Sequence, residues 1–512
     1  MIGFDVNEET RISDKYWKFC IGSGHAALAQ RTDYQEQLEF IHKTLGFERV
    51  RFHGIFHDDM NVVQTLCEAV PIPGGEVVWD ISFYQVAKVY DAILKIGMRP
   101  FVELSSMPTA LASGKNTFFH YKANKTPPKD MAQWQKLIRE FALFLIDRYG
   151  KEEVESWYFE VWNEPNLDFF WTGGMKGYFE LYKYTVLALK EVDEKLKVGG
   201  PSTAENAWLI EMQEYCRQEN LPLDFLSTHH YPGDALGHDT SSADPEFVNS
   251  ISEALKHPED KSILDIMRLI LSQDTKLPKM EKGILTRQAK KAREEAGTLP
   301  LLYTEWNVNS ACSARLLDTK TNAAFIVKTI HDNEGIVDGY SYWTFSDIFE
   351  ETLFYPEPFH GGFGLLNHDG IPKPAYWAFY LLNQLGNERY LLPDTGSGVE
   401  MAAYKKDDTI QIMLWHQKYV QSEEWEEIYL YLENVKDIKR VTVQKIDDTH
   451  CNPLGIWEQM GAPKLLKPEE VEDIKEKSTM VEEELSYKQD KEGIKITTTM
   501  GVNDVQLITV TR

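Results

Sequence analysis

The stretch DMAQWQKLIREFALFLIDRYGKEEVESWYFEVWNEP, residues 130–165, decides the fold. In its first part, 130–149, apolar residues recur at i, i+3 and i+4 spacing, which predicts an amphipathic helix. The short apolar run 158–162 then predicts a strand. The strand ends at Asn163 and Glu164, and Pro165 follows, so a carboxyl group stands where a loop begins.

The same alternation of strand and helix extends over about residues 15–382 and predicts parallel β/α units. Helices are expected at 82–96, 130–149 and 178–192. Eight strands are expected, which predicts an α/β protein with a (β/α)8 TIM barrel. They are Phe19–Gly24, Arg49–Gly54, Arg99–Ser105, Tyr158–Trp162, Lys197–Gly200, Phe225–Tyr231, Leu301–Thr304 and Gly339–Phe345.

The last part of the chain, 383–512, has a different character, because short strand-like segments follow one another there. This pattern predicts an antiparallel β-sandwich, interrupted by an acidic helical piece at 468–478. Residues 1–14 are expected to add a strand to it. The expected strands of the sandwich are Glu400–Tyr404, Thr409–Trp415, Glu427–Tyr431, Arg440–Lys445, Gly493–Thr498 and Val505–Thr511.

A long insertion at about 233–295 interrupts the barrel after its sixth strand, and it contains the basic run 276–293. Charge runs of this kind are mostly solvated helix faces, which is the leading interpretation. A lid over the barrel or a contact between subunits is the alternative.

Composition narrows the class of partner. The chain of 512 residues carries a formal charge of −26, which disfavours nucleic acids and anionic membrane surfaces. The five cysteines are scattered without a CxxC pair, so neither a zinc site nor a disulfide framework is expected; they are Cys20, Cys67, Cys216, Cys312 and Cys451. No secretory signal and no apolar run long enough for a membrane span is present, so a cytoplasmic location is expected.

The second carboxyl group of interest is Glu305, in Thr304-Glu305-Trp306-Asn307, at the end of the seventh predicted strand. In a barrel, strands four and seven face each other across the mouth, so Glu164 and Glu305 are expected to face each other. A protonated carboxyl group and an ionised carboxylate about 5–5.5 Å apart are what a retaining glycosidase needs. Asn163, beside the expected acid, is placed to hold the sugar hydroxyl next to the reacting carbon.

Other polar and aromatic residues follow the second, sixth and eighth strands. Tyr231 is expected to hydrogen-bond the nucleophile, and Arg51 to pair with Glu305. Singly, a strand-end histidine or tryptophan is more often structural than functional. Their joint placement at one face of the barrel favours sugar binding, and the set is His53, His229, Tyr231, Trp343 and Glu351.

These residues stand in longer motifs that closely resemble glycoside hydrolase family 39, and within it the bacterial β-xylosidases. The motifs include RFHGIFHDD, EVWNEPNLDFFW, STHHYP, YTEWN, SYWTFSDIFEE and PFHGGFGLLNHDGIPKPAYWAF, and they span nearly the whole chain. The resemblance implies that Glu164 is the acid/base and Glu305 the nucleophile. It also implies that His53, Asn163, His229, Tyr231, Trp343 and Glu351 line the subsite for a terminal xylose of xylo-oligosaccharides. No metal or cofactor is expected. The resemblance also implies an oligomer, such as a tetramer.

The chain departs from the resemblance in places that put the leaving-group preference in doubt. Trp306 stands where many relatives carry Phe, the segment 308–312 lacks a Tyr often found nearby, and the insertion 233–295 is long. An α-L-arabinosidase or β-glucosidase stays open as an alternative. An α-L-iduronidase is disfavoured because an ionised Glu351 would repel the substrate, and a non-catalytic carbohydrate-binding protein is the remaining alternative.

Overall fold

Eight parallel strands close into a barrel in the computed structural model, which describes residues 2–65, 79–232, 281–310, 314–351, 357–392, 398–420 and 422–512. Each barrel strand pairs with the next barrel strand along the chain, and the eighth pairs with the first, as expected from the sequence. The strands are β3 (Cys20–His25), β4 (Arg49–His53), β7 (Arg99–Leu104), β10 (Tyr158–Val161), β11 (Lys197–Thr203), β12 (Phe225–His230), β13 (Leu301–Trp306) and β14 (Gly339–Tyr342).

Amphipathic helices surround the barrel and bury their apolar faces against it. In α4, for example, Trp134, Leu137, Ile138 and Phe141 are buried at the spacing seen in the sequence. The helices are α1 (Thr32–Leu45), α3 (Tyr84–Ile96), α4 (Met131–Tyr149), α5 (Lys151–Glu155), α6 (Gly174–Val192), α7 (Leu209–Gln218), α10 (Ile284–Ala296), α11 (Lys320–Asn333) and α12 (Pro374–Gln384). Phe83 is the N-cap of α3, and Gly97 ends that helix with a φ of 103°.

The inside of the barrel changes from apolar to charged along the strands. At the end where the strands begin, aromatic rings close the barrel, and Tyr158 stacks on Phe101 with 5.7 Å between ring centroids. Side chains of a strand alternate between its two faces. Glu160 and Glu103, which are register partners, lie two residues beyond Tyr158 and Phe101 and therefore point to the same face. The layer of charged groups therefore lies nearer the ends of the strands, where a TIM barrel carries its chemistry.

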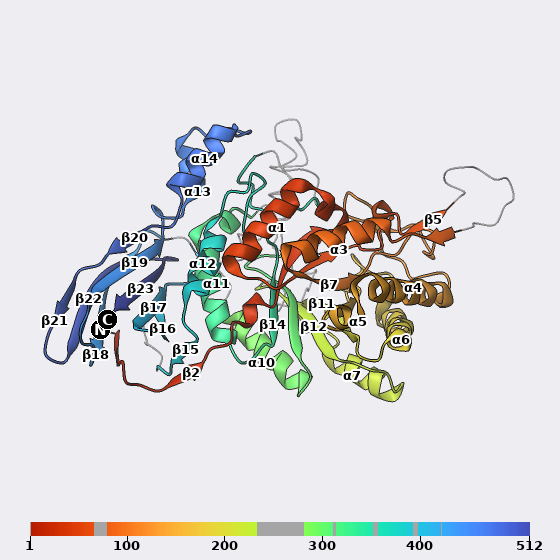
Figure 1. Cartoon of the computed structure of the whole chain (residues 1–512), viewed down its shortest axis with the longest axis horizontal. Helices are drawn as coiled ribbons and strands as arrows, with labels where there is room; N and C mark the ends of the chain where they lie inside the picture. Colours follow the sequence, from red (N-terminus) through yellow and green to blue (C-terminus); the bar gives the residue numbers. More distant parts are fainter. Residues whose placement is uncertain are drawn as a thin grey trace, which may run out of the picture.

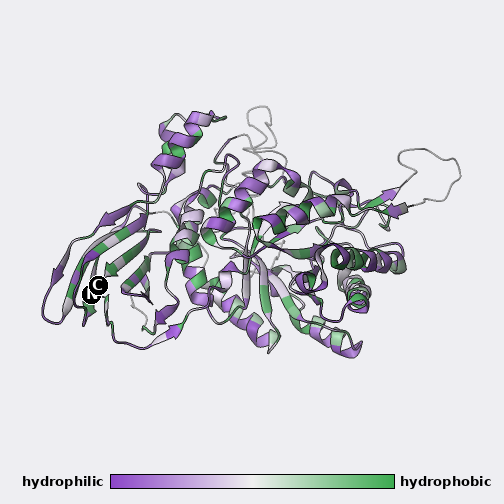
Figure 2. Cartoon of the chain, viewed as in Figure 1, coloured by the Kyte–Doolittle hydropathy of each residue, from purple (hydrophilic) through white to green (hydrophobic). Residues whose placement is uncertain are grey.

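The second part of the molecule consists of two sheets that contain strands from both ends of the chain (Figure 1). One sheet has the order β1-β18-β22-β21, and the other β2-β15-β16-β17-β23-β19-β20. Apolar side chains alternate with polar ones along these strands, as the bands of Figure 2 show, and the apolar ones form a separate core with Phe4, Ile412 and Leu430. The strands are β1 (Ile2–Asp5), β2 (Thr10–Ile12), β15 (Glu388–Tyr390), β16 (Glu400–Lys406), β17 (Thr409–Trp415), β18 (Trp425–Glu433), β19 (Arg440–Ile446), β20 (Glu482–Glu484), β21 (Tyr487–Gln489), β22 (Gly493–Gly501) and β23 (Val505–Thr511).

Two helices project from this second part, α13 (Pro453–Gln459) and α14 (Pro468–Lys477). The helix expected at 468–478 is therefore present, whereas α13 was not expected. Most of the insertion at 233–295 lies outside the described residues, but its end forms α10, on which Lys290 and Lys291 are exposed, as expected for a solvated helix face.

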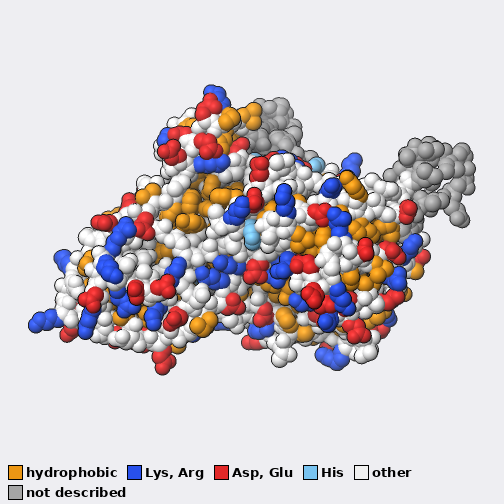
Figure 3. Space-filling model, in the orientation of Figure 1, with side chains coloured by type: hydrophobic (Ala, Val, Ile, Leu, Met, Phe, Trp, Pro, Cys, Tyr) orange, Lys and Arg blue, Asp and Glu red, His pale blue; other side chains and the backbone are white. Residues whose placement is uncertain are grey.

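Acidic and basic side chains are interspersed over the face drawn in Figure 3. Cys20, Cys216 and Cys451 are free and buried, whereas Cys67 and Cys312 lie outside the described residues. No helix within the described ranges is long and apolar enough to cross a membrane.

Candidate active site

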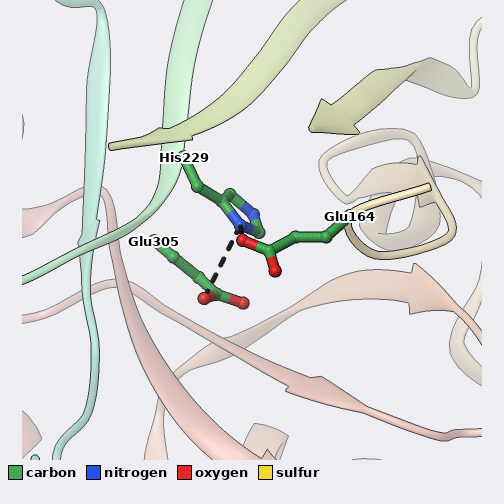
Figure 4. A group of neighbouring side chains, drawn as sticks. All are labelled: Glu164, His229 and Glu305. Atoms are coloured by element: carbon green, nitrogen blue, oxygen red, sulfur yellow. Dashed lines mark hydrogen bonds and ion pairs between the residues drawn. The ribbon is translucent and has the colours of Figure 1, made fainter. Parts of the chain in front are cut away.

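Glu164 and Glu305 face each other at the end of the barrel where the strands finish, as Figure 4 shows. Oxygens of the two carboxyl groups and a ring nitrogen of His229 all lie within 4.8 Å of one another. Inverting glycosidases keep their carboxyl groups about 6.5–9.5 Å apart to admit a water molecule, while retaining ones keep them at about 5–5.5 Å. The separation therefore fits direct attack by one carboxylate on the sugar.

Glu305 is held from two sides as an acceptor of hydrogen bonds. Arg51 Nη1 lies 2.9 Å from its Oε1, and the Tyr231 hydroxyl donates to its Oε2 over 3.1 Å. Both contacts were expected from the sequence. Donors aimed at both oxygens fix the orientation of this carboxylate.

Arg51 connects the two sides of the site. The buried guanidinium donates to Glu160 Oε2 over 2.6 Å and to Asn163 Oδ1 over 2.9 Å, and its Nη2 lies 2.8 Å from Glu103 Oε2. Several carboxylates around it raise the pKa of Arg51 further, although burial opposes this, so it stays charged. Its bond to Asn163 Oδ1 fixes the orientation of that amide.

Glu103 and Glu160 were not expected from the sequence. Each stands inside an apolar run, Phe101-Val102-Glu103-Leu104 and Phe159-Glu160-Val161, and both are fully buried. A glutamate inside an otherwise apolar strand is costly to bury without a cation, so it is itself a signal for a buried partner. Arg51, which lies within β4, the strand that pairs with β7, is that partner of both glutamates.

Glu164 lies on a constrained turn directly after β10. Trp162 and Glu164 both have positive φ values, 69° and 43°, which L-residues other than Asn and Asp seldom adopt. The Glu164 N–H donates to Ser202 O over 2.8 Å, which ties this turn to β11. The neighbouring strand thereby compensates for the strained backbone and holds the side chain over the centre of the barrel.

The surroundings of Glu164 favour its protonated form. Burial raises its pKa to about 7, and the charges of His53 and Arg51 oppose this. His229 lies with Nδ1 2.8 Å from Glu164 Oε1, and burial lowers the pKa of this histidine to about 4, so the ring is neutral.

A chain of hydrogen bonds fixes the tautomer of His229. Thr304 Oγ1 donates to Glu160 Oε1 over 2.7 Å and lies 3.2 Å from His229 Nε2. With its proton committed to Glu160, the threonine oxygen accepts from His229 Nε2–H. His229 Nδ1 is then an acceptor, and the protonated Glu164 donates to it.

His53, Glu351 and Trp343 form the other side of the site. His53 Nδ1 lies 2.6 Å from Glu103 Oε2, and its Nε2 lies 3.4 Å from Glu351 Oε1. Burial lowers the pKa of His53, but Glu103 above all raises it to about 9. The Trp343 ring lies 4.9 Å from the His53 ring, and a Cβ at Gly22 would come within 2.5 Å of the indole, so the indole needs glycine there.

The state of Glu351 differs from the one assumed from the sequence. Burial raises its pKa to about 8, opposed by His53 and reinforced by Glu305 and Glu103. Near neutral pH the group is therefore largely protonated, and its charge is a weaker argument against an anionic sugar than expected.

Trp306 does not lie at the mouth of the site, in contrast to the expectation. It is fully buried and stacks on Tyr340 with 4.8 Å between ring centroids. Trp306 directly follows Glu305 in β13, and adjacent side chains of a strand point to opposite faces. It therefore packs outside the barrel against the helices, and a Phe there would alter packing and not sugar contacts. Residues 311 and 312 of the segment 308–312, which also departs from the family pattern, lie outside the described ranges.

Glu164, His229 and Glu305 are also close enough for their ligand atoms to bind a metal ion. Two observations disfavour this use. Arg51 lies 2.9 Å from Glu305, and a second cation beside it would be repelled. The oxygens of Glu305 and Glu164 Oε1 already have hydrogen-bond partners within the site.

Comparison with known proteins agrees with the glycosidase-like placement of Glu164 and Glu305. The model of glycosyl hydrolases family 39 matches residues 1–257 and 255–492. A beta-xylosidase of Caldicellulosiruptor saccharolyticus is 42% identical over 479 residues, which are 93% of this chain and 90% of the relative. A beta-xylosidase of Geobacillus stearothermophilus is 35% identical over 464 residues, 90% of this chain and 86% of the relative. The crystal structure of a monomeric beta-xylosidase from Caulobacter crescentus CB15 superposes with a TM-score of 0.79 at 28% identity, covering 100% of this chain and 99% of the other. The chain therefore belongs to glycosyl hydrolases family 39.

Proposed function

We propose that this protein is a retaining, exo-acting β-xylosidase that releases terminal β-D-xylose from xylo-oligosaccharides. The observation that carries the proposal is the facing pair of carboxyl groups in opposite surroundings. Glu305 accepts from Arg51 and Tyr231, whereas Glu164 has a pKa raised to about 7. The two relatives of highest identity named above are described as beta-xylosidases.

In the first step, Glu305 attacks the anomeric carbon and Glu164 gives its proton to the leaving oxygen. The bond between the sugar and the leaving group breaks as a bond between the anomeric carbon and a Glu305 oxygen forms. The Asn163 amide, oriented by Arg51, donates to the hydroxyl beside the anomeric carbon, a contact that strengthens in the transition state.

In the second step, the ionised Glu164 takes a proton from water, and this water attacks the anomeric carbon from the side that the leaving group left. The bond to Glu305 breaks, and the carboxylate returns to the donors of Arg51 and Tyr231. His229 Nδ1 accepts again from Glu164 when the proton is back on the acid. Two inversions leave xylose in the β-configuration.

The sugar on which this machinery acts is tested with a panel of nitrophenyl glycosides. We expect kcat/KM for the β-D-xyloside to exceed that for the β-D-glucoside and the α-L-iduronide at least about 100-fold, the range that pocket contacts supply. A preference for the α-L-arabinoside would assign the second candidate, an arabinosidase with the same two carboxyl groups. Binding of xylo-oligosaccharides with no hydrolysis of any glycoside would contradict both.

The raised pKa of Glu164 predicts how activity depends on pH. The acid is active only with its proton, so kcat/KM for xylobiose is expected to fall as pH rises through about 7. The pKa of Glu351, about 8, is close to that of Glu164, so the two groups are tested in separate variants. The basic limb should disappear in Glu164→Gln, measured on a substrate with a good leaving group, and persist in Glu351→Gln. An unchanged limb in Glu164→Gln would remove Glu164 from the role of acid.

The oligomer and the cytoplasmic location expected from the sequence stay predictions. The similar enzyme from Caulobacter crescentus CB15 is described as monomeric. Sedimentation analysis of the purified protein decides between one subunit and several.

A further inference from the structure

A second group of rings lies beside the sugar site and takes no part in the steps above. Tyr121 belongs to the turn between the short strands β8 (Thr117–Phe118) and β9 (Ala123–Asn124), in the loop that follows β7. Its ring stacks on His25 at the end of β3, with ring centroids 4.1 Å apart and planes 16° apart. His57 meets the same tyrosine edge-on at 5.3 Å. Two rings from different strand ends thus fix one tyrosine from a loop.

Asp59 holds the two histidines in place. Its Oδ2 lies 3.3 Å from His25 Nε2, and its Oδ1 lies 2.7 Å from His57 Nδ1. The charges of both histidines and their hydrogen bonds lower the pKa of Asp59, although burial opposes this. The carboxylate therefore stays ionised and fixes the rings that contact Tyr121.

This group lies next to Glu351. His25 is the register partner of His53, whose Nε2 is 3.4 Å from Glu351 Oε1. A Cβ at Gly24 would come within 2.4 Å of Phe349 O, so β3 touches the segment that leads to Glu351. Burial raises the pKa of Tyr121 well above its usual value, and the charge of Glu351 adds most to this effect.

Several polar atoms of this group make no hydrogen bond within the described part of the chain, although His53 Nε2 lies 3.4 Å from one of them, Glu351 Oε1. Within the described part of the chain, the Tyr121 hydroxyl, Glu351 Oε1 and His25 Nδ1 are buried and make no hydrogen bond. A buried polar group left without a hydrogen bond destabilises the folded protein. Atoms of this kind beside a sugar site are satisfied when hydroxyls of the bound sugar reach them, since a hydroxyl donates and accepts.

We propose that the Tyr121 hydroxyl, together with Glu351 Oε1, binds a hydroxyl of the terminal sugar on the side away from the anomeric carbon. This inference rests on the proposed function and assigns a further substrate-binding residue to it. Glu305 Oε1 and Glu351 Oε1 both face His53 Nε2, at 3.8 and 3.4 Å. Because Asn163 is assigned the hydroxyl beside the anomeric carbon, the hydroxyl that Tyr121 and Glu351 bind is the one on carbon 3 or carbon 4. Two groups that make no hydrogen bond within the described part of the protein thereby select a saccharide that carries a hydroxyl at this position.

The test compares Tyr121→Phe with the wild type on 4-nitrophenyl β-D-xyloside and on its 3-deoxy and 4-deoxy analogues. The variant keeps the ring and its stacking and removes one oxygen. We expect it to lose about tenfold in kcat/KM on the parent xyloside. On the analogue that lacks the bound hydroxyl, it should match the wild type, because the partner of Tyr121 is already missing. A role in packing alone would lower the activity on all three substrates equally.

Tyr90→Phe is the matched control, because the Tyr90 hydroxyl in α3 is also buried without a hydrogen bond among the described residues and lies outside the site. It should leave all three rates unchanged. Full activity of Tyr121→Phe on the parent, or an equal loss on all three substrates, overturns the inference. Failure of the wild type to cleave the parent xyloside overturns the proposed function instead, and the comparison is then made on deoxy analogues of the pyranoside that the wild type cleaves.

Discussion

Glu305→Gly is expected to lower kcat on 4-nitrophenyl β-D-xyloside by about 10⁴-fold or more, the scale on which enzymes lose activity with their nucleophile. The variant has no atom that reaches the anomeric carbon, so no covalent intermediate forms. Wild-type protein treated with a 2-fluoro-xyloside should carry the sugar on the peptide that contains Glu305, as mass spectrometry detects.

Azide adds a stereochemical test to this prediction. In Glu305→Gly, azide enters the space of the lost carboxylate and attacks from that face, so the product is the α-azide and never the β-azide. Glu152→Gly, which removes an exposed carboxylate from α5, should keep wild-type turnover. Substantial activity of Glu305→Gly, or a labelled peptide without Glu305, would assign the nucleophile elsewhere.

Glu164→Ala is expected to divide substrates by their leaving groups. On xylobiose, whose leaving oxygen needs a proton, kcat/KM should fall by about 10²–10⁴-fold, the usual contribution of a general acid. On a dinitrophenyl xyloside the loss in kcat/KM should stay below about tenfold, because that leaving group departs unprotonated. Steady-state rates on the two substrates check the prediction.

The second step is tested in the same variant. Without a base to activate water, the xylosyl-enzyme should accumulate and lower kcat on the activated substrate. Azide needs no base, so it should restore kcat and yield the β-azide. Glu153→Ala, which removes a carboxylate from Arg99 at the other end of the barrel, is the control that should behave as wild type on both substrates. Equal losses on xylobiose and the activated xyloside would exclude Glu164 as the acid.

The barrel was predictable because each strand is a short apolar run between amphipathic helices, a pattern that local sequence carries by itself. Strand ends were less predictable. The eighth strand, expected at 339–345, stops at Tyr342, because Thr344, Phe345 and Asp347 form backbone hydrogen bonds with residues 363–366. The sequence also left open how the sandwich strands divide between the two sheets. Strands β1 and β18 lie far apart in the chain, so no local sequence pattern indicates that they pair. The domain limits expected from the sequence stay a prediction.

The site was predictable where a polar residue follows or closes a predicted apolar strand and was missed where it interrupts an apolar run. Glu164 and Glu305 stand at the ends of predicted strands, and the structure brings them together with Arg51, which lies within β4. Glu103 and Glu160 lie within strands, where the apolar pattern hides them. Tyr121 comes from a loop, and its position depends on rings of two distant strand ends that no local pattern relates.

The two sheets of the sandwich have a consequence for the order in which the chain acquires its structure. β1 pairs with β18 and β2 with β15, so each of these two strands is synthesised more than 370 residues before the strand with which it pairs. The barrel is synthesised in between and folds before those partners exist, since domains fold as units during synthesis. Until Glu388 and the residues beyond it emerge from the ribosome, β1 and β2 have no sheet to join.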